Sequence, residues 1–422
     1  MIAPLLLALL PLVLPATLTG HWEGTMHRGS AQLRVSFDFP GETPNRGFFS
    51  APDLGAIDIP LSNLKLGSRV GWELVGDATT SSFDATATGD TMSGTFREGS
   101  SAGLFDLHRV STSAQKPYTK QDVTFQNGAV RLSGTVFAPR TPGKHPGIIF
   151  VQGSGAEGRW ATAYLADYVA RHGIVALTYD KRGVGASTGD WRASTLGDLV
   201  ADARAGIALL AARADVKASD VGVYGHSQGA ELSPAIAENN PSVSWIIAAD
   251  GPVGPQYRQD LYRVDNILAQ HFSGAQLDDA QRLYAEFVDV ARTGAPHEKL
   301  RADIRSAGDA PWLDYIGIPD DQSWIWDWYR SAGNYDNTGA WASVRVPVLL
   351  VFGSDDALVP PKQSIAQTSD ILRAHDAGRV AAQIFPGADH TLRVPPATPD
   401  GWPHNAAGFP DVIVTFVLAR QP

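Results

Sequence analysis

Residues 225–229, with the sequence GHSQG, carry the pattern with the clearest chemical meaning in this chain. An apolar run at residues 221–224 precedes them, and a helix-like run at residues 230–238 follows them. A serine in a tight turn between a strand and a helix has a strained backbone and an exposed hydroxyl. The glycines two positions to either side are needed because a Cβ there would collide with the neighbouring strand and helix. The pattern predicts that Ser227 is a nucleophile at such an elbow.

A serine hydroxyl needs a base that takes its proton, and the base needs an acid that orients it. In this strand–turn–helix context the acid and the base follow the serine, each at the carboxyl end of a later strand. A buried-type strand at residues 346–352 leads to Asp355 and Asp356, and a strand at residues 381–385 leads to His390. We therefore expect His390 to act as general base and then general acid, and Asp356 to orient its ring. Asp355 stays open as the alternative acid.

Acyl transfer also requires N–H donors for the oxyanion that forms on the carbonyl. One donor is the backbone N–H of the residue after the nucleophile, here Gln228. The other donor comes from the loop after an earlier strand, where residues 153–155 (GSG) let backbone amides approach a ligand. The backbone N–H of Ser154 is the candidate. A plain strand-to-helix turn would have the same geometry, so the sequence leaves both interpretations open.

Two patterns of secondary structure position these groups. Short alternating segments at residues 21–110 predict a small antiparallel β domain, and the polar residues 111–120 predict a linker. Residues 121–422 alternate apolar strands with helices, which predicts an α/β domain with a mostly parallel sheet, entered by a hairpin at residues 127–128 (NG). The alternation of strands and helices is interrupted at about residues 252–345, where apolar residues at helical spacing predict a helical insert.

Composition excludes several classes of function. A chain of 422 residues is long enough for two domains. With 34 Lys and Arg against 44 Asp and Glu, its formal net charge is −10, which predicts no nucleic-acid partner. The absence of Cys removes disulfides, thiolate metal sites and a cysteine nucleophile. Because neither clustered ligands nor a phosphate-binding glycine loop is present, we expect no metal and no cofactor.

Residues 1–18 are almost wholly apolar and precede an abruptly polar segment. The run is too short for a membrane span, and prolines interrupt it. A secretory signal peptide cut near Ala16 fits better, although no Lys or Arg precedes the run and no small-x-small site ends it. We expect export to the periplasm or the medium, with an uncleaved membrane tether as the alternative.

From about residue 120 onward, the sequence resembles the α/β-hydrolase superfamily, near its bacterial esterase and serine-aminopeptidase-like branch. The resemblance implies the α/β-hydrolase fold, in which the insert forms a helical cap over the active site. Gln152 stands where a His often precedes the oxyanion glycine, and Ala230-Glu231 follow the elbow where a second Gly is usual. The matching segments, in chain order, are residues 153–155, 180–189, 225–229, 353–360 and 387–390.

Three functions are open at this point. A carboxylesterase, which cleaves esters of small to medium substrates through an acyl-enzyme, comes first because a triad and an oxyanion loop suffice. A serine aminopeptidase or prolyl-type peptidase acting on short peptides would also need acidic residues that hold a free amino terminus. A non-catalytic binding protein on a hydrolase fold is disfavoured by the complete triad. The acidic candidates for the peptidase are Glu157, Glu231, Asp314 and Asp327.

Overall fold

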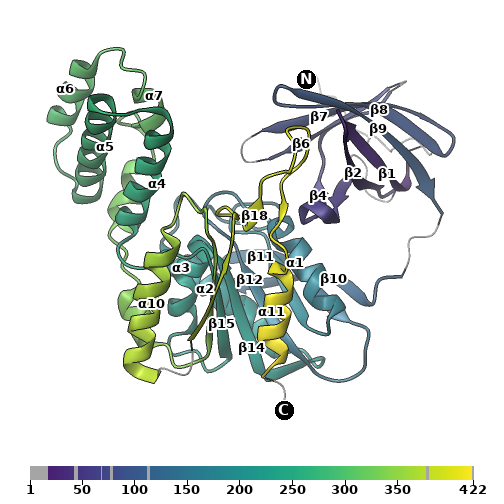
Figure 1. Cartoon of the computed structure of the whole chain (residues 1–422). Helices are drawn as coiled ribbons and strands as arrows, with labels where there is room; N and C mark the ends of the chain where they lie inside the picture. Colours follow the sequence, from purple (N-terminus) through teal and green to yellow (C-terminus); the bar gives the residue numbers. More distant parts are fainter. Residues whose placement is uncertain are drawn as a thin grey trace, which may run out of the picture. The chain divides into compact units, whose positions relative to one another are not determined.

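The structure, a computed structural model, shows an antiparallel β unit and an α/β unit (Figure 1). Residues 1–17, which make up most of the predicted signal peptide, lie outside the described residues. Leu18, the last residue of that prediction, is buried in the core of the β unit. The structure describes residues 18–41, 46–67, 69–76, 79–111, 115–376 and 380–420.

Backbone contacts divide the chain differently from the sequence pattern in two places: β10 begins at Tyr118, inside the predicted linker, and a segment near the C-terminal end belongs to the β unit. One compact unit comprises Met1–Lys116 and Pro395–His404, and the other comprises Pro117–Val394 and Asn405–Pro422. The sequence pattern assigned all of residues 121–422 to the α/β domain. The segment Pro395–His404 departs from that assignment because its packing partners belong to the β unit.

The first unit is one antiparallel sheet that curls around an aromatic core. The strand order is β4-β3-β2-β1-β9-β8-β7-β6-β5. The two edge strands, β4 and β5, are separated in the chain by Leu61 alone, so the sheet nearly closes on itself at that corner. The elements are β1 (Gly20–Arg28), β2 (Ala31–Phe39), β3 (Phe48–Ala51), the 3₁₀ turn η1 (Pro52–Leu54), β4 (Ala56–Pro60), β5 (Ser62–Lys65), β6 (Val70–Val75), β7 (Thr80–Thr88), β8 (Thr91–Glu98) and β9 (Ser101–Val110).

Alternate side chains of these strands fill the core. In β2, Leu33, Val35 and Phe37 are buried while the residues between them are more exposed, as the period of two predicts. The rings of Trp72 and Phe83 stack in the same core with their planes 9° apart. The predicted antiparallel β domain is therefore confirmed.

A segment from near the end of the chain completes this unit. The ring of Trp402 lies against that of Phe96, with 6.2 Å between the centroids, and the Arg28 guanidinium lies 4.2 Å above the Trp402 ring. Arg28 also donates to the backbone carbonyl of Asp400 at 2.9 Å and to that of Gly401. The short strands β18 (Arg393–Val394) and β19 (His404–Asn405) pair with each other where this segment leaves and rejoins the second unit.

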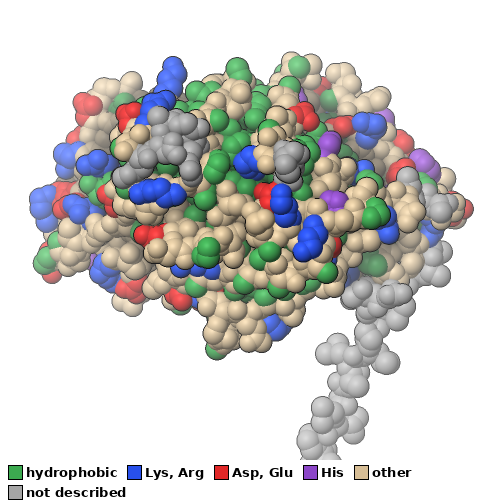
Figure 2. Space-filling model, turned by 90° about the horizontal axis from the view of Figure 1, so that it is seen from below, with side chains coloured by type: hydrophobic (Ala, Val, Ile, Leu, Met, Phe, Trp, Pro, Cys, Tyr) green, Lys and Arg blue, Asp and Glu red, His purple; other side chains and the backbone are tan. Residues whose placement is uncertain are grey.

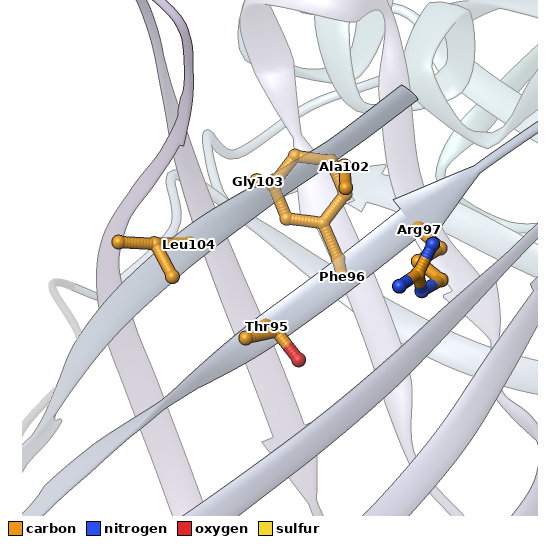
Figure 3. Close-up of a pocket in the computed structure, with 6 residues that line it drawn as sticks. All are labelled: Thr95, Phe96, Arg97, Ala102, Gly103 and Leu104. Atoms are coloured by element: carbon orange, nitrogen blue, oxygen red, sulfur yellow. The ribbon is translucent and has the colours of Figure 1, made fainter. Parts of the chain in front are cut away.

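A surface hollow of about 330 Å³ lies over β8 and β9 (Figure 3). The ring of Phe96 lies beside Gly103, where a Cβ would come within 2.5 Å of it, and Leu104 is 62% exposed. Arg97 supplies the one charged side chain of the lining. These six lining residues include no nucleophile paired with a base. They are Thr95, Phe96, Arg97, Ala102, Gly103 and Leu104.

The second unit is built on a sheet with the order β10-β11-β13-β12-β14-β15-β16-β17. The hairpin of β10 and β11 is antiparallel and joins β13 antiparallel, whereas all pairs from β13 to β17 are parallel. This arrangement confirms the predicted fold class and the hairpin at Asn127. The strands are β10 (Tyr118–Asn127), β11 (Val130–Pro139), β12 (His145–Val151), β13 (Val175–Tyr179), β14 (Val216–His226), β15 (Val243–Ala249), β16 (Val348–Gly353) and β17 (Val380–Phe385).

Helices cover both faces of this sheet. In β15, Ile246 packs in the core with residues of α2 and α3, whereas the preceding Trp245 contacts Phe416 of α11. Successive residues of a strand point to opposite faces, so α11 and α3 lie on different sides. The C-terminal helix begins at Phe409. The covering helices are the 3₁₀ turn η2 (Arg159–Thr162), α1 (Ala163–Arg171), α2 (Leu196–Ala211), α3 (Gln228–Ala237), α9 (Thr338–Ser343), α10 (Pro361–Asp376) and α11 (Phe409–Leu418).

The predicted insert is helical and has its own small core. Trp312, Trp326 and Tyr329 are buried there, whereas Trp341 of α9 packs into the core of the sheet. The independent cap therefore ends before α9, ahead of the boundary at residue 345 that the sequence suggested. Its elements are α4 (Gln256–His271), α5 (Ala275–Thr293), α6 (Glu298–Ala307), α7 (Leu313–Ile316), α8 (Ile325–Trp328) and the π-helical turn η3 (Tyr329–Gly333).

The surface carries charges of both signs. On the face shown in Figure 2, Lys and Arg side chains are interspersed with Asp and Glu. Within the described part of the chain, no helix combines the length and the apolar character that crossing a membrane requires.

Candidate active site

The turn after β14 has the strained geometry that the sequence predicted. Ser227 lies between β14 and α3 with φ 53° and ψ −116°, a region that non-glycine residues rarely adopt. A Cβ on Gly225 would lie 2.2 Å from the carbonyl oxygen of Gly229, and a Cβ on Gly229 would lie 2.2 Å from that of Val151. Both contacts are shorter than any van der Waals contact, so both positions require glycine. Ser227 itself is only partly buried, which leaves its side chain accessible.

The structure brings His390 and Asp356 together. Nδ1 of His390 lies 2.8 Å from Oδ2 of Asp356, whose side chain is fully buried. The other carboxylate oxygen, Oδ1, accepts the N–H groups of Leu358 at 2.7 Å and Val359 at 2.9 Å. Asp355 is exposed and accepts a hydrogen bond from the Ser354 hydroxyl at 2.6 Å. Asp356, rather than its neighbour, is therefore placed to orient the imidazole.

His226, the residue before the nucleophile, contacts the backbone of the candidate base. Its Nε2 lies 2.8 Å from the carbonyl oxygen of His390. Burial, together with the nearby His390, lowers the pKa of His226 to about 4, so the ring is neutral near pH 7. A carbonyl can only accept, so Nε2 carries the proton and donates it. The sequence reasoning did not assign this role, because position 226 is simply the variable residue of the elbow pattern.

Asp250 is a second carboxyl group beside Asp356. It follows β15 directly and accepts the N–H of Gly353 at 2.9 Å, while its other oxygen has no hydrogen-bond partner among the described residues. Burial and the charge of Asp356 raise the pKa of Asp250 well above its usual range. The sequence analysis missed this residue, although its place at the carboxyl end of a parallel strand could have marked it.

Among the described residues, one group of side chains could together hold a metal ion. It consists of Asp250, Asp356 and His390. One ligand atom from each lies within 4.8 Å of the others. The hydrogen bond between His390 and Asp356 already uses one atom of each residue. A cation here would therefore compete with the acid–base pair, rather than occupy a separate site.

The loop after β12 passes over the nucleophile. A Cβ on Gly153 would lie 3.4 Å from the Cβ of Ser227, so the Gly153–Ser154 peptide lies directly beside the elbow. Gln228 is the first residue of α3, where backbone N–H groups have no partner within the helix. The side chain of Gln152 is buried and donates to the backbone carbonyl of Tyr179, at the end of β13. The Gln152 side chain, at the position where a His is often found, therefore anchors the loop to the sheet.

The four acidic residues considered for binding an amino terminus occupy different environments. Glu157 lies in the loop after β12, and its carboxylate accepts the N–H of Gly153 at 3.1 Å. Glu231 is buried within α3, where burial raises its pKa to about 8. Asp314 is exposed on α7, and Asp327 pairs with Arg330. Of the four, the structure brings Glu157 beside the loop next to Ser227.

Known proteins similar in sequence to this chain include an esterase and an uncharacterised protein. Esterase EstD of Thermotoga maritima is 30% identical over 167 residues, which cover 36% of this chain and 39% of that protein. An uncharacterised protein of Mycobacterium tuberculosis is 25% identical over 280 residues, covering 66% of this chain and 75% of the relative. The match thus spans about two fifths of the Thermotoga esterase and three quarters of the mycobacterial protein.

Solved structures with a similar arrangement include an esterase and a peptidase. The Pyrococcus furiosus esterase Pf2001 matches 67% of this chain and 89% of its own, at 18% identity and a TM-score of 0.42. The proline iminopeptidase of Mycobacterium smegmatis matches 70% of this chain and 97% of its own, at 19% identity and a TM-score of 0.46.

A protein-family model covers most of the second unit. The model describes the X-Pro dipeptidyl-peptidase (S15) family and matches residues 127–387, which is more than half of the chain. The match includes the second strand of the hairpin, the elbow and the strand that precedes Asp356, and it ends before His390. The chain therefore belongs to the X-Pro dipeptidyl-peptidase (S15) family of α/β hydrolases.

Proposed function

We propose that this hydrolase is a serine carboxylesterase that cleaves esters of small to medium size through an acyl-enzyme. The observation that carries the proposal is the 2.8 Å contact between His390 Nδ1 and Asp356 Oδ2, in a unit whose elbow holds Ser227 in strained geometry. A base oriented by a buried carboxylate is what a serine hydroxyl needs to become a nucleophile. Neither a metal ion nor a cofactor is needed for these steps.

The proposed reaction proceeds in two halves. Ser227 Oγ forms a bond to the ester carbonyl carbon while its proton moves to Nε2 of His390, and the carbonyl electrons move to the oxygen. The N–H groups of Ser154 and Gln228 stabilise that oxyanion. When the intermediate collapses, the bond to the alcohol oxygen breaks and His390 gives its proton to the leaving alcohol. Water then attacks the acyl-enzyme by the same route and releases the acid and free Ser227.

Asp356 has a positioning role in this scheme. Hydrogen bonds from Leu358 and Val359 fix one carboxylate oxygen, so the other is held toward His390. The carboxylate keeps the proton of the neutral ring on Nδ1, which leaves Nε2 free to accept from the serine. It also stabilises the imidazolium that forms after proton transfer.

A peptidase acting on short peptides is the second candidate, and the family match favours it. Such an enzyme would have to bind a free amino terminus, for which Glu157 is the acidic residue beside the oxyanion loop. Its carboxylate already accepts the N–H of Gly153. Since this bond occupies part of the acceptor capacity, we place ester cleavage first.

Parallel assays separate the two candidates. Purified protein is given p-nitrophenyl esters of increasing acyl length, together with aminoacyl and X-Pro p-nitroanilides. We expect turnover of the esters with kcat/KM at least 100-fold above that for any nitroanilide. Higher kcat/KM on a nitroanilide with a free amino terminus would favour the peptidase. The absence of turnover on both, without labelling by a fluorophosphonate, would favour a binding protein.

The proposal for localisation rests on the N-terminal sequence alone. We propose export to the periplasm or the medium, based on the apolar run at residues 1–18. Expression of the full chain followed by fractionation and N-terminal sequencing tests this proposal. A mature N-terminus near residue 17 supports export, and an intact Met1 in the cytosolic fraction contradicts it.

A further inference from the structure

Lys181 is a buried cation in a loop to which the proposed mechanism assigns no role. It follows β13 in the segment DKRGVGASTG, residues 180–189, and is only 5% exposed. Burial lowers the pKa of Lys181 to about 8, although the facing carboxylate of Glu157 acts in the opposite direction. Burying an ammonium group costs free energy that nearby acceptors must offset. The acceptors that surround this one are therefore informative.

The Lys181 ammonium contacts the two segments that carry the proposed oxyanion donors. Its Nζ donates to the backbone carbonyl of Gly153 and lies 3.4 Å from the side-chain oxygen of Gln228. Gly153 immediately precedes one proposed donor, Ser154, and Gln228 is the other. The backbone N–H of Lys181 also bonds the carbonyl of Glu157 at 3.2 Å, which ties the two loops together.

The geometry of a peptide group links the ammonium to the oxyanion. The carbonyl of Gly153 and the N–H of Ser154 belong to the same peptide group, and no cis peptide occurs among the described residues. In a trans peptide these two groups point in opposite directions. A cation bound to the carbonyl therefore turns the N–H away from Lys181. It also polarises the peptide and strengthens the N–H as a donor, because hydrogen bonds in series reinforce one another at low dielectric.

Glu157 fixes the other side of the same glycine. Its carboxylate accepts the N–H of Gly153 at 3.1 Å. Gly153 is thus held at its N–H by an anion and at its carbonyl by a cation. A Cβ at this glycine would lie 2.9 Å from the Glu157 carboxylate, which shows how closely that side chain approaches the glycine.

We infer that Lys181 is a positioning residue that orients and polarises the Gly153–Ser154 peptide for oxyanion binding. This inference rests on the proposed serine-hydrolase function, and it adds a role for the DKRG segment. Lys181 acts through the peptide and does not touch the substrate. Its contribution therefore grows as charge develops on the carbonyl oxygen, and it affects turnover more than substrate binding.

Three substitutions test the inference. Lys181→Met removes the ammonium and keeps the length of the side chain, and replacing a buried charge with an apolar group is often compatible with folding. Lys181→Gln keeps an uncharged N–H donor and serves as the second test if the methionine variant does not fold. Lys217→Met is the matched control, because Lys217 lies at the opposite end of β14 from the elbow.

The readouts are steady-state kinetics on a p-nitrophenyl ester and affinity for two inhibitors of equal chain length. A trifluoromethyl ketone adds to Ser227 and forms an oxyanion, whereas the matching secondary alcohol does not. For Lys181→Met we expect kcat to fall about 10- to 100-fold, less than the roughly 10²- to 10³-fold loss of a direct donor. KM and alcohol affinity should change less than about 2-fold, while trifluoromethyl ketone affinity falls in parallel with kcat. Lys181→Gln should lie between Lys181→Met and the wild type, and Lys217→Met should match the wild type.

Wild-type kcat in both Lys181 variants would overturn the inference, as would a loss confined to KM. An equal loss of affinity for both inhibitors would indicate a general structural role and would also contradict it. Failure of the proposed function is seen separately, as ester turnover retained by Ser227→Ala. An inactive Ser227→Ala beside a fully active Lys181→Met leaves the function in place and removes only the role of Lys181.

Discussion

At the scale of single residues, the structure distinguishes two neighbouring acids, of which the sequence favoured Asp356 and left Asp355 as the alternative. Asp355 and Asp356 both follow β16, and a periodic pattern does not tell which of two consecutive loop residues turns inward. Asp356 turns toward His390, and Asp355 bonds Ser354. The roles of His226 and Lys181 were likewise not predictable, because each depends on a contact with a residue far away in the chain.

The two acids give a direct prediction for activity. Asp356→Asn should lower kcat on the ester by about 10⁴, because an amide favours the wrong imidazole tautomer. Asp355→Asn should stay within about 3-fold of the wild type and serves as the control. Steady-state kinetics on both variants check the prediction. A larger loss in Asp355→Asn than in Asp356→Asn would reverse the assignment of the acid.

Glu231 gives a prediction for stability against pH. Its pKa is raised from 4.5 to about 8 in the folded state, so folding takes up a proton between these values. The stabilisation from the neutral carboxyl is complete below about pH 4.5 and is lost as the pH rises toward 8, at up to roughly 1.4 kcal/mol per pH unit. Glu231→Gln is neutral at every pH. It should therefore gain stability relative to the wild type as the pH rises from 5 to 8.5.

Urea denaturation at pH 5 and pH 8.5 measures this difference for Glu231→Gln. The exposed Glu298 gives the control variant Glu298→Gln, whose stability relative to the wild type should show the smaller change between the two values. If Glu231→Gln differs from the wild type by the same free energy at both pH values, the carboxyl is not held neutral by burial.

At the scale of elements, the strand–turn–helix pattern was sufficient to predict the elbow. Its glycines are required by backbone contacts between β14, α3 and the end of β12, as the sequence argument assumed. The boundary of the cap was less predictable. The sequence predicts a helical insert at about residues 252–345, but not that Trp341 of α9 faces the core of the sheet.

The elbow glycines give a prediction at this scale. Gly225→Ala should reduce soluble, folded protein or lower the free energy of unfolding by several kcal/mol, because its Cβ has only 2.2 Å to a backbone oxygen that cannot move away easily. Any folded fraction should show kcat reduced more than 100-fold. Gly339→Ala is the control, since a Cβ at this helical position meets no atom within 4 Å. Wild-type activity and stability in Gly225→Ala would contradict the geometry of the elbow.

At the scale of the whole molecule, the sequence predicts the two-domain organisation, but it does not predict that the chain returns to the first domain. The change from alternating strands to strand–helix repeats marks the two architectures. No periodic pattern in the sequence predicts that Pro395–His404 belongs to the first unit. Its place there depends on the contact of Trp402 with Arg28, two residues that are far apart in the chain.

Trp402 gives a prediction for the first unit. Trp402→Ala removes the contacts with Phe96 and Arg28, and should lower the free energy of unfolding of that unit by about 1–3 kcal/mol, less than for a fully buried Trp. Chemical denaturation followed by aromatic fluorescence measures this loss. Val75→Ala, at a position that is 62% exposed, is the control and should change stability by less than about 0.5 kcal/mol. Equal stability of Trp402→Ala and the wild type would show that the segment does not hold the unit together.

The central claim is that Ser227 is the nucleophile of a serine hydrolase, and a fluorophosphonate probe tests it most directly. The probe is applied to the wild type and to Ser227→Ala, and the labelled peptide is identified by mass spectrometry while ester turnover is measured in parallel. We predict one label, on Ser227, and a loss of several orders of magnitude in kcat for Ser227→Ala, because triad members act as one unit. Labelling of Ser227→Ala to the wild-type extent, or ester turnover by that variant near the wild-type rate, would contradict the account.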